Sequence, residues 1–354
     1  MKIQSIHAWR EKLSLKKPYT IAYKTIADTE LIFTEIILQN GITGIGSSNP
    51  FPEVVKETSE IAVSNLNSAF IQDFIGRDIR TFQQLIDETA ANFSKQPGTL
   101  AAIDIALHDA FGKYLGISVL DFYGRKTEAL PTSITIGIKE TKEMIEEAKG
   151  YQALGFRVLK IKTGHNVDED IERIHKLKEA FANSFTIRVD ANQGYTVENL
   201  QKFIRETRQD IELIEQPVQA GAENVLQQVN AEERKFLAAD ESLLDVTDAS
   251  ALSHPPQPYG IYNIKLMKCG GIKSGREIAS IAKHAGIHLF WGCNDESIVS
   301  ITAALHAAYS CSNTKYIDLD GSFDLSKDLV EGGFVLKDGC MHPVNKPGLG
   351  FSKI

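Results

Sequence analysis

The sequence contains little cysteine and no long apolar run. Its four cysteines are scattered along 354 residues without a CxxC pair: Cys269, Cys293, Cys311 and Cys340. This excludes a disulfide scaffold and is typical of reduced, buried thiols in a cytoplasmic protein. No uninterrupted apolar stretch approaches the roughly 20 residues that a membrane-spanning helix needs. The N-terminal segment is interrupted by charge and lacks the apolar core of a signal peptide, so we expect neither export nor membrane insertion.

An excess of basic charge is also missing. The formal net charge is -8 at pH 7, whereas general nucleic-acid binding needs a basic surface that displaces counterions from phosphates. With 354 residues and 43% hydrophobic content, the chain can bury a large core as a globular protein of one large domain or two. No heptad or partner-helix pattern is present, and a homo-oligomer stays open.

The pattern of apolar and polar residues in the first third of the chain predicts a small α+β domain. Alternating residues 31–47 predict antiparallel strands joined at Asn40 and Gly41, and residues 52–70 and 98–114 have helical patterns. The glycines at 41, 44 and 46 are not interpreted as a phosphate loop, because no helix opens directly after them.

From about residue 130, short β-branched runs alternate with longer amphipathic helical segments. Strand-helix alternation of this length requires a parallel sheet with right-handed crossovers, and eight repeats predict a closed (β/α)8 barrel. The eight strand candidates are 133–138, 156–162, 185–190, 211–215, 235–240, 260–265, 287–292 and 315–320.

Four of these strands end on a charged residue at regular intervals. Asp190, Glu215, Asp240 and Lys265 are spaced 25 residues apart (215 - 190, 240 - 215, 265 - 240). The carboxyl ends of barrel strands face one mouth, where the catalytic groups of this fold lie. The alternative is that the acids are ordinary loop residues on the barrel rim.

Three carboxylates in one cavity repel one another unless a cation or a raised pKa neutralises them. An all-oxygen ligand set without His or Cys favours Mg²⁺, which leaves coordination positions open for water and substrate oxygens. We therefore expect one Mg²⁺ per subunit, held by Asp190, Glu215 and Asp240.

The second strand candidate, FRVLKIK, carries two lysines on one face, because side chains two apart on a strand share a side. Lys160 and Lys162 should face the metal site, which pushes each toward its neutral form and makes Lys162, nearer the mouth, a competent base. Lys160 would tune Lys162 and hydrogen-bond the substrate or a metal ligand. The alternative is a pair of snorkelling lysines on an edge strand.

Lys265 ends the sixth strand, almost opposite the second strand in an eight-stranded barrel. Two lysines flanking one substrate can remove a proton from one face of a carbon acid and return a proton to the other face. A lysine base can work together with Mg²⁺ in this way, because the metal stabilises the negative charge of the enolate. Lys268 is expected to be an ordinary loop residue.

Five motifs carry a family resemblance over nearly the whole chain: KIK (160–162), VDANQGY (189–195), IEQP (214–217), ADES (239–242) and NIKLMKCGGI (263–272). The chain resembles the enolase superfamily, muconate-lactonising subgroup. The resemblance implies Mg²⁺ at the positions of Asp190, Glu215 and Asp240. It also implies a modified barrel over residues 126–321 and an α+β capping domain over residues 1–125, completed by the tail 322–354.

The eighth strand narrows the reaction. Asp318 and Asp320 in YIDLDG point to one side by the strand alternation and require a cation, such as an α-ammonium group of the substrate. An Asp-x-Asp at this place resembles the dipeptide epimerases of the subgroup, in which these acids hold the amino terminus of the dipeptide. The alternative is a structural pair that caps the next loop.

The second residue of the dipeptide is predicted from two positions. Residues 16–25 resemble a cap loop of the family, in which Lys24 would pair with a glutamyl side chain. Asp295, in GCNDES (292–297), departs from the family pattern and would neutralise Lys24 or repel a glutamyl substrate. We therefore expect L-Ala-L-Xaa with a small or hydrophobic second residue, with Ala-Glu kept open.

Two alternatives from other classes are weighed. Muconate cycloisomerase or o-succinylbenzoate synthase would use the same scaffold, but their anionic substrates have no use for Asp318 and Asp320. A binding protein without chemistry would have no need for lysines on both faces of the cavity.

Overall fold

The computed structural model describes residues 1–20 and 25–354, with only the backbone described at residues 17–20, 25 and 26. The chain begins with a three-stranded antiparallel sheet, β1 (Ile3–Thr20), β2 (Thr25–Leu38) and β3 (Thr43–Ser48). The predicted hairpin at Asn40 and Gly41 is confirmed. The 18-residue strand β1 was not predicted.

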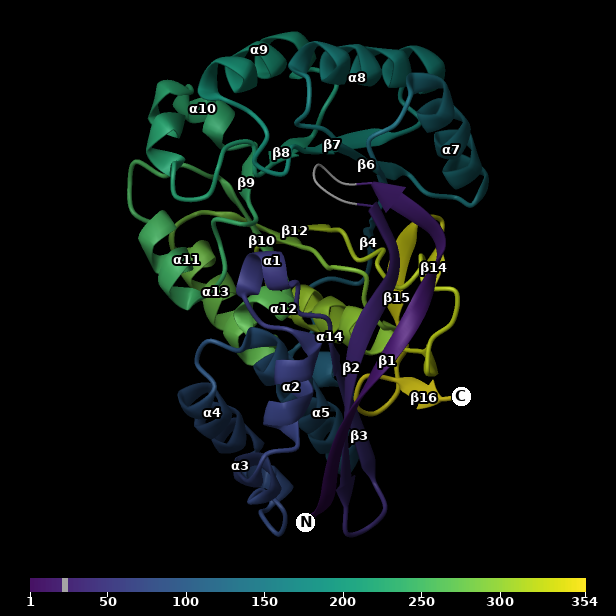
Figure 1. The fold of residues 1–354 in the computed structure, drawn as a ribbon, viewed down its shortest axis with the longest axis vertical. Helices are drawn as coiled ribbons and strands as arrows, with labels where there is room; N and C mark the ends of the chain where they lie inside the picture. Colours follow the sequence, from purple (N-terminus) through teal and green to yellow (C-terminus); the bar gives the residue numbers. More distant parts are fainter. Residues whose placement is uncertain (21–24) are drawn as a thin grey trace.

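Helices follow, and the 19-residue helix over Pro97–Leu115 packs directly on this sheet (Figure 1). The single helical pattern expected over residues 52–70 is divided among α1, α2 and α3. The helices are α1 (Pro52–Val55), α2 (Ser59–Leu66), α3 (Ala69–Gln72), α4 (Phe82–Asn92), α5 (Pro97–Leu115) and α6 (Val119–Tyr123), with a 3-10 turn at Ile79–Thr81.

The glycines of β3 allow the sheet to pack directly on α5. A Cβ atom at Gly44 would lie 2.4 Å from the backbone oxygen of Ala106, and one at Gly46 would lie 1.9 Å from that of Ala102. No larger side chain fits between the two backbones at these distances. The glycines therefore serve close packing of strand on helix.

Eight parallel strands form the predicted barrel. Their order is β5 to β12, and the bridge between Thr132 and Ile317 joins its two edges. All eight strand predictions are confirmed within a few residues: β5 (Ser133–Ile136), β6 (Val158–Lys162), β7 (Thr186–Asp190), β8 (Leu213–Glu215), β9 (Leu237–Ala239), β10 (Ile261–Ile264), β11 (His288–Trp291) and β12 (Thr314–Ile317).

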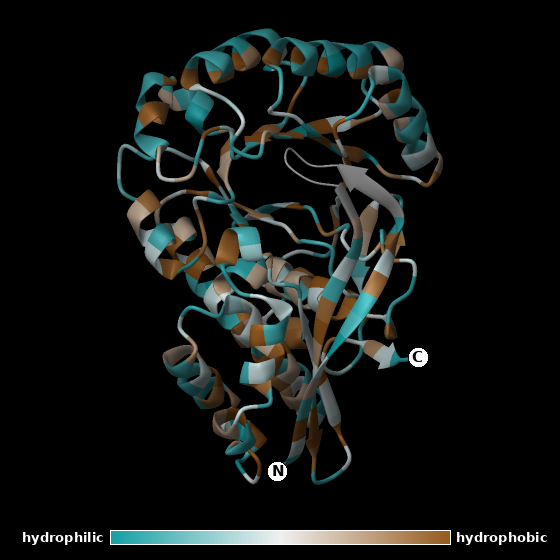
Figure 2. Ribbon diagram, viewed as in Figure 1, coloured by the Kyte–Doolittle hydropathy of each residue, from teal (hydrophilic) through white to brown (hydrophobic). Residues whose placement is uncertain are grey.

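Helices cover the outside of the barrel and turn their apolar sides inward. Helix α8, for example, is started by the Asn166 side chain, which accepts from two backbone N–H groups, and it buries Ile171, Ile174 and Leu177. Hydrophilic and hydrophobic residues accordingly alternate along α8 and α9 (Figure 2). The helices are α7 (Thr141–Ala153), α8 (Val167–Phe181), α9 (Val197–Thr207), α10 (Ala231–Arg234), α11 (Val246–Leu252), α12 (Leu266–Cys269), α13 (Ile272–His284) and α14 (Ile298–Tyr309), with a 3-10 segment at Glu223–Gln228.

The C-terminal tail runs back along the first sheet (Figure 1). It forms β13 (Val330–Gly332), β14 (Phe334–Lys337), β15 (Cys340–Pro343) and β16 (Phe351–Lys353), and β15 pairs with β4 (Leu130–Pro131). Leu349 N donates to Asp109 on α5 at 2.9 Å. We propose on these contacts that residues 1–125 and the tail form one capping domain. Among the described residues, no helix has the length and apolar composition needed to cross a bilayer.

Candidate active site

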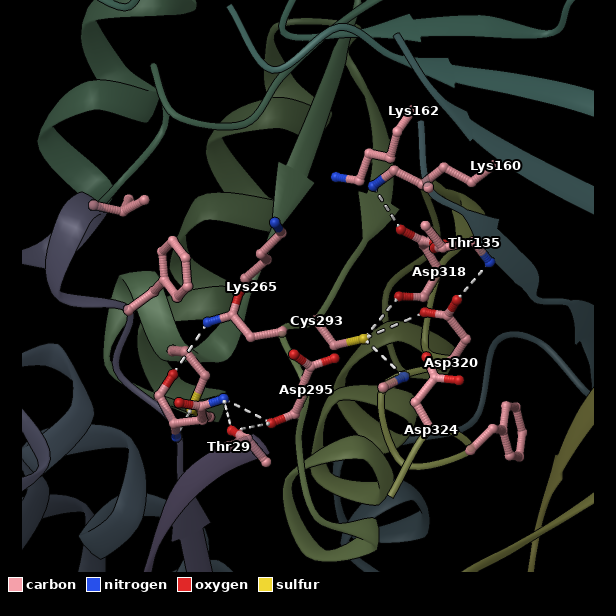
Figure 3. Close-up of a pocket in the computed structure, with 18 of the residues that line it drawn as sticks. Thr29, Thr135, Lys160, Lys162, Lys265, Cys293, Asp295, Asp318, Asp320 and Asp324 are labelled. Atoms are coloured by element: carbon pink, nitrogen blue, oxygen red, sulfur yellow. Dashed lines mark hydrogen bonds and ion pairs between the residues drawn. The ribbon is translucent and has the colours of Figure 1, made fainter. Parts of the chain in front are cut away.

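A cavity of about 880 Å³ lies at the carboxyl ends of the barrel strands, under residues of the first sheet and of α1 (Figure 3). Its wall includes Lys160, Lys162, Asp240 and Lys265, as well as Asp318 and Asp320. The sequence analysis singled out all six of these residues. The barrel mouth therefore brings together charged groups from several different strands or strand ends.

The three predicted metal-binding acids are buried side by side. Asp190 and Glu215 end the neighbouring strands β7 and β8 in direct register, and Asp240 follows β9 by one residue. Asp190 and Glu215 are 0% exposed and Asp240 is 3% exposed. Asn263 on β10, which the sequence analysis did not single out, donates its side-chain N–H to Glu215 Oε1 at 2.7 Å.

Lys160 lies between these acids and the eighth strand. Its Nζ atom is 3.1 Å from Asp190 Oδ2, 2.8 Å from Glu215 Oε2 and 2.8 Å from Asp318 Oδ2. Lys160 is 3% exposed. The prediction that Lys160 and Lys162 share one face of the strand is confirmed, and the snorkelling alternative is wrong because both ammonium groups point into the cavity (Figure 3).

Lys162 and Lys265 reach the cavity from strands on opposite sides of the barrel. The order of strands places β7, β8 and β9 between β6 and β10. Lys162 Nζ donates to Asp190 Oδ2 at 2.7 Å and to Asn192 Oδ1 at 3.1 Å, while Lys265 Nζ donates to Asp240 Oδ2 at 2.8 Å. Each of the two lysine side chains is 13% exposed, so both are accessible from the cavity.

Lys160 and Lys162 were expected to be pushed toward the neutral form beside a bound metal ion, whereas the protein groups alone act on Lys160 in the opposite direction. Burial opposes the charged form of Lys160, but the carboxylates of Asp318, Glu215 and Asp190 outweigh burial and raise its pKa well above the usual value. Burial likewise opposes the charged form of Lys265, but Asp240 and Glu215 outweigh it and raise the pKa. The protein groups alone therefore hold both lysines in the protonated state.

Asp318 and Asp320 follow β12 rather than lying within the strand. Asp318 is 3% exposed and Asp320 is 5% exposed. Asp320 Oδ2 accepts from Thr135 N at 2.8 Å, whereas Asp318 Oδ1 has no hydrogen-bond partner among the described residues. Burial and the neighbouring charges of Asp318 and Asp324 raise the pKa of Asp320 to about 8. The protein groups alone therefore disfavour a negative charge on Asp320 beside Asp318.

Asp295 and Lys24 were predicted to select the second residue of the dipeptide, and of the two only Asp295 lies within the described residues. Asp295 lines the cavity, and its backbone oxygen accepts from Asn49 Nδ2 at 2.6 Å, which joins the barrel to the first sheet. Lys24 lies outside the described residues. Of the expected cap loop, residues 16–20 belong to β1 and Thr25 begins β2.

Two sequence families cover this chain. Residues 4–124 match the family described as mandelate racemase / muconate lactonizing enzyme, N-terminal domain, and residues 143–352 match the family described as enolase C-terminal domain-like. The chain belongs to the mandelate racemase / muconate lactonizing enzyme family. The predicted resemblance to the enolase superfamily, muconate-lactonising subgroup, and the predicted fold class are confirmed.

Several relatives within this family are similar over their full length. An L-Lys-D/L-Arg epimerase of Desulforapulum autotrophicum is 49% identical over 100% of both chains. The structure of a dipeptide epimerase from Methylococcus capsulatus, complexed with Mg and the dipeptide L-Arg-D-Lys, is 45% identical with a TM-score of 0.97 and covers 99% of both chains. The dipeptide epimerase of Enterococcus faecalis complexed with Mg and L-Leu-L-Tyr is 33% identical with a TM-score of 0.94, over 99% of this chain and 100% of that chain.

The acids of this family member suit a hard divalent cation by chemistry and by charge. Burial and the neighbouring Asp190 raise the pKa of Glu215 to about 8, and burial with Asp240 raises the pKa of Glu241 to about 7. These raised pKa values indicate that the nearby lysines do not balance all the negative charge. Within the described residues, no three acidic, His or Cys side chains are arranged to hold a metal ion. The Lys160 ammonium group instead contacts both Asp190 and Glu215.

Besides Asn263, two further contributions to the site were missed from the sequence. The prediction that Lys268 is an ordinary loop residue is wrong: it lies on α12, is 6% exposed and pairs with Asp240. Cys293 accepts from Gly321 N at 3.3 Å and donates to Asp318 O at 3.2 Å, so its thiol fixes the loop that carries both acids after β12. The position of Cys293 at the end of the seventh strand, directly after Gly292, was the available signal.

Proposed function

We propose that this chain is a Mg²⁺-dependent dipeptide epimerase, an isomerase that inverts the α-carbon of the N-terminal residue. The observation that carries the proposal is the placement of Lys162 and Lys265 on opposite sides of one cavity, with Asp318 and Asp320 on its wall (Figure 3). Dipeptide epimerases among its relatives, two of them in complexes with Mg and a dipeptide, support it.

The two lysines would perform a 1,1-proton transfer. One lysine removes the α-proton from one face and leaves an enolate, and the other lysine delivers a proton to the opposite face. Each lysine must lose a proton before it acts as the base. The raised pKa of Lys265 falls when positive charge enters the cavity, and the α-ammonium of a dipeptide contributes such a charge.

Asp190, Glu215 and Asp240 would hold the cofactor. When bound, Mg²⁺ supplies a Lewis acid that stabilises negative charge on the peptide carbonyl oxygen. Lys160, which already contacts Asp190 and Glu215, would donate a hydrogen bond toward the same developing charge.

Asp318 and Asp320 would bind the substrate ammonium group. Asp318 Oδ1 has no hydrogen-bond partner among the described residues, and the pKa of Asp320 is raised. A bound cation would stabilise the negative charge of both carboxylates. We expect Asp320→Asn to raise KM for the dipeptide by at least about tenfold, since charge-assisted hydrogen bonds contribute roughly 1.5–3 kcal/mol, while Mg²⁺ affinity stays unchanged. Steady-state kinetics together with a Mg²⁺ titration measure both. Equal losses in metal and substrate binding would contradict the assignment.

A basic dipeptide is the substrate class that we propose. The Desulforapulum and Methylococcus proteins are more similar to this chain than the Enterococcus protein is. The Desulforapulum protein is named an L-Lys-D/L-Arg epimerase, and the Methylococcus structure contains the dipeptide L-Arg-D-Lys. We therefore replace the expectation of L-Ala-L-Xaa. The cavity wall also carries Asp295 and Asp324, whose carboxylates suit cationic side chains and disfavour a glutamyl residue. A role for Lys24 remains a prediction.

The function is tested by measuring epimerisation of L-Lys-L-Arg, L-Arg-L-Lys and L-Ala-L-Leu with chiral chromatography. We expect kcat/KM for the two basic dipeptides to exceed that for L-Ala-L-Leu by more than about tenfold, because each lost charge pair costs binding. Inversion of the C-terminal residue, or no inversion of any dipeptide, would contradict the proposal. Higher activity on L-Ala-L-Leu would contradict only the substrate class.

We also propose that the protein is cytoplasmic and that the ligand of the cavity is a small-molecule dipeptide. The described cysteines Cys269, Cys293, Cys311 and Cys340 are free thiols, as reduced conditions require. A homo-oligomer stays a prediction.

A further inference from the structure

Lys268 is a buried lysine turned toward Asp240. It lies on the short helix α12, three residues after Lys265. Its Nζ atom donates to the backbone oxygen of Asp240 at 2.6 Å, to the backbone oxygen of Asn263 at 3.2 Å and to Oδ1 of the Asp240 carboxylate. An ammonium group has three N–H donors, so these three acceptors leave none for a substrate. Lys268 can act on the reaction only through its protein partners.

The lysines of the cavity form two similar pairs. Asp190 contacts Lys160 and Lys162, and Asp240 contacts Lys268 and Lys265. In each pair, one lysine side chain is 4–5% exposed and makes several protein contacts, while the other is 13% exposed. The pairing therefore combines one fixed and one accessible ammonium group on each carboxylate.

We infer that Lys268 is a positioning residue that fixes the Asp240 carboxylate. A carboxylate turns readily about its last torsion. Because Lys268 holds Oδ1 and the backbone oxygen, Oδ2 stays directed toward Lys265 at 2.8 Å. Within the described residues, this is the only hydrogen bond of Lys265 Nζ.

The influence of Lys268 extends to a second acid. Asn263 accepts from Lys268 through its backbone and donates to Glu215 Oε1 through its side chain at 2.7 Å. Lys268 thus links the carboxylates of Asp240 and Glu215 without lying between them. Partners of this kind orient metal-binding side chains.

The decisive experiment is a calorimetric titration of Mg²⁺ into the full-length Lys268→Met variant. We expect the Kd for Mg²⁺ to rise about 10- to 100-fold, the usual effect of removing a group that orients a metal ligand. Lys268→Arg, which keeps the charge and the donors, should recover most of the affinity. Lys113→Met is the matched control, because Lys113 makes an equivalent pair with the buried Asp109 at 2.7 Å on α5. It should leave Mg²⁺ affinity unchanged.

A second readout rests on the proposed function. In deuterium oxide, Lys268→Met should slow α-proton exchange on the face served by Lys265 more than on the face of Lys162, measured from separate L- and D-epimers of a basic dipeptide.

Wild-type Mg²⁺ affinity in a Lys268→Met variant with a cooperative thermal transition would overturn the inference. If that variant does not fold, Lys268→Gln replaces it, with the same expected rise in Kd and the same contradicting result. A wild-type protein that exchanges no dipeptide proton would refute the proposed function and leave the Mg²⁺ titration valid.

Discussion

Replacing Lys162 or Lys265 by alanine is expected to lower the kcat of epimerisation by about 10²- to 10⁴-fold, the usual contribution of a positioned general acid or base. Inversion needs one group on each face of the α-carbon, and the two lysines enter the cavity from opposite sides of the barrel. Neither lysine can replace the other. Chiral chromatography of a basic dipeptide measures the loss directly.

The two variants should differ from an inactive enzyme in their isotope exchange. Each variant keeps one lysine, so each should still exchange the α-proton of one epimer with deuterium oxide while forming little of the other epimer. Lys235→Ala is a suitable control, because Lys235 makes an exposed pair with Glu232 on the outside of the barrel. Full epimerase activity in either cavity variant would remove the two-base mechanism.

Chelation of divalent cations is expected to abolish activity, and added Mg²⁺ should restore it. The α-proton of a dipeptide is a weak acid, and the carboxylate-rich wall disfavours a further negative charge. The raised pKa of Glu215, about 8, reports this with the protein groups alone. Asp190→Asn should weaken Mg²⁺ binding and epimerisation together, because Asp190 is placed among the metal ligands. Activity measured against Mg²⁺ concentration checks both effects.

Asp170→Asn provides a comparison outside the proposed ligand set. Asp170 is also buried, but it pairs with Arg173 and accepts from Tyr195 at 2.8 Å. We expect its replacement to affect thermal stability while Mg²⁺ affinity remains. An Asp190→Asn variant with wild-type Mg²⁺ affinity would contradict the metal assignment, and so would full activity in the presence of a chelator.

The barrel was predictable because its strands are short, apolar and regularly spaced. The runs that end at Asp190, Glu215 and Asp240 are flanked by clear helical patterns, which fixes parallel strands and one common mouth. Strand β1 was not predictable in the same way. Between Ile3 and Thr20 its residues pair with β2 over a long, partly exposed ribbon, so charged residues interrupt the apolar pattern.

The side chains of the site were predicted better than their contacts. Alternation along a strand places Lys160 and Lys162 on one face, but it cannot tell which carboxylate each ammonium group reaches. The structure pairs Lys160 with three acids whose charges raise its pKa, whereas the sequence analysis considered only the metal cation, the neighbouring lysine and burial. Lys268 was missed because it lies on a helix directly after a strand, where the alternation of the strand no longer applies.

The measurement that tests the account most directly is deuterium uptake from deuterium oxide by a mixed library of L,L-dipeptides, with the wild-type protein and Mg²⁺, followed by mass spectrometry. The account predicts a gain of one mass unit at the α-carbon of the N-terminal residue, strongest for dipeptides of lysine and arginine and absent without the metal. No uptake across the library, with Mg²⁺ binding demonstrated on the same sample, would contradict it.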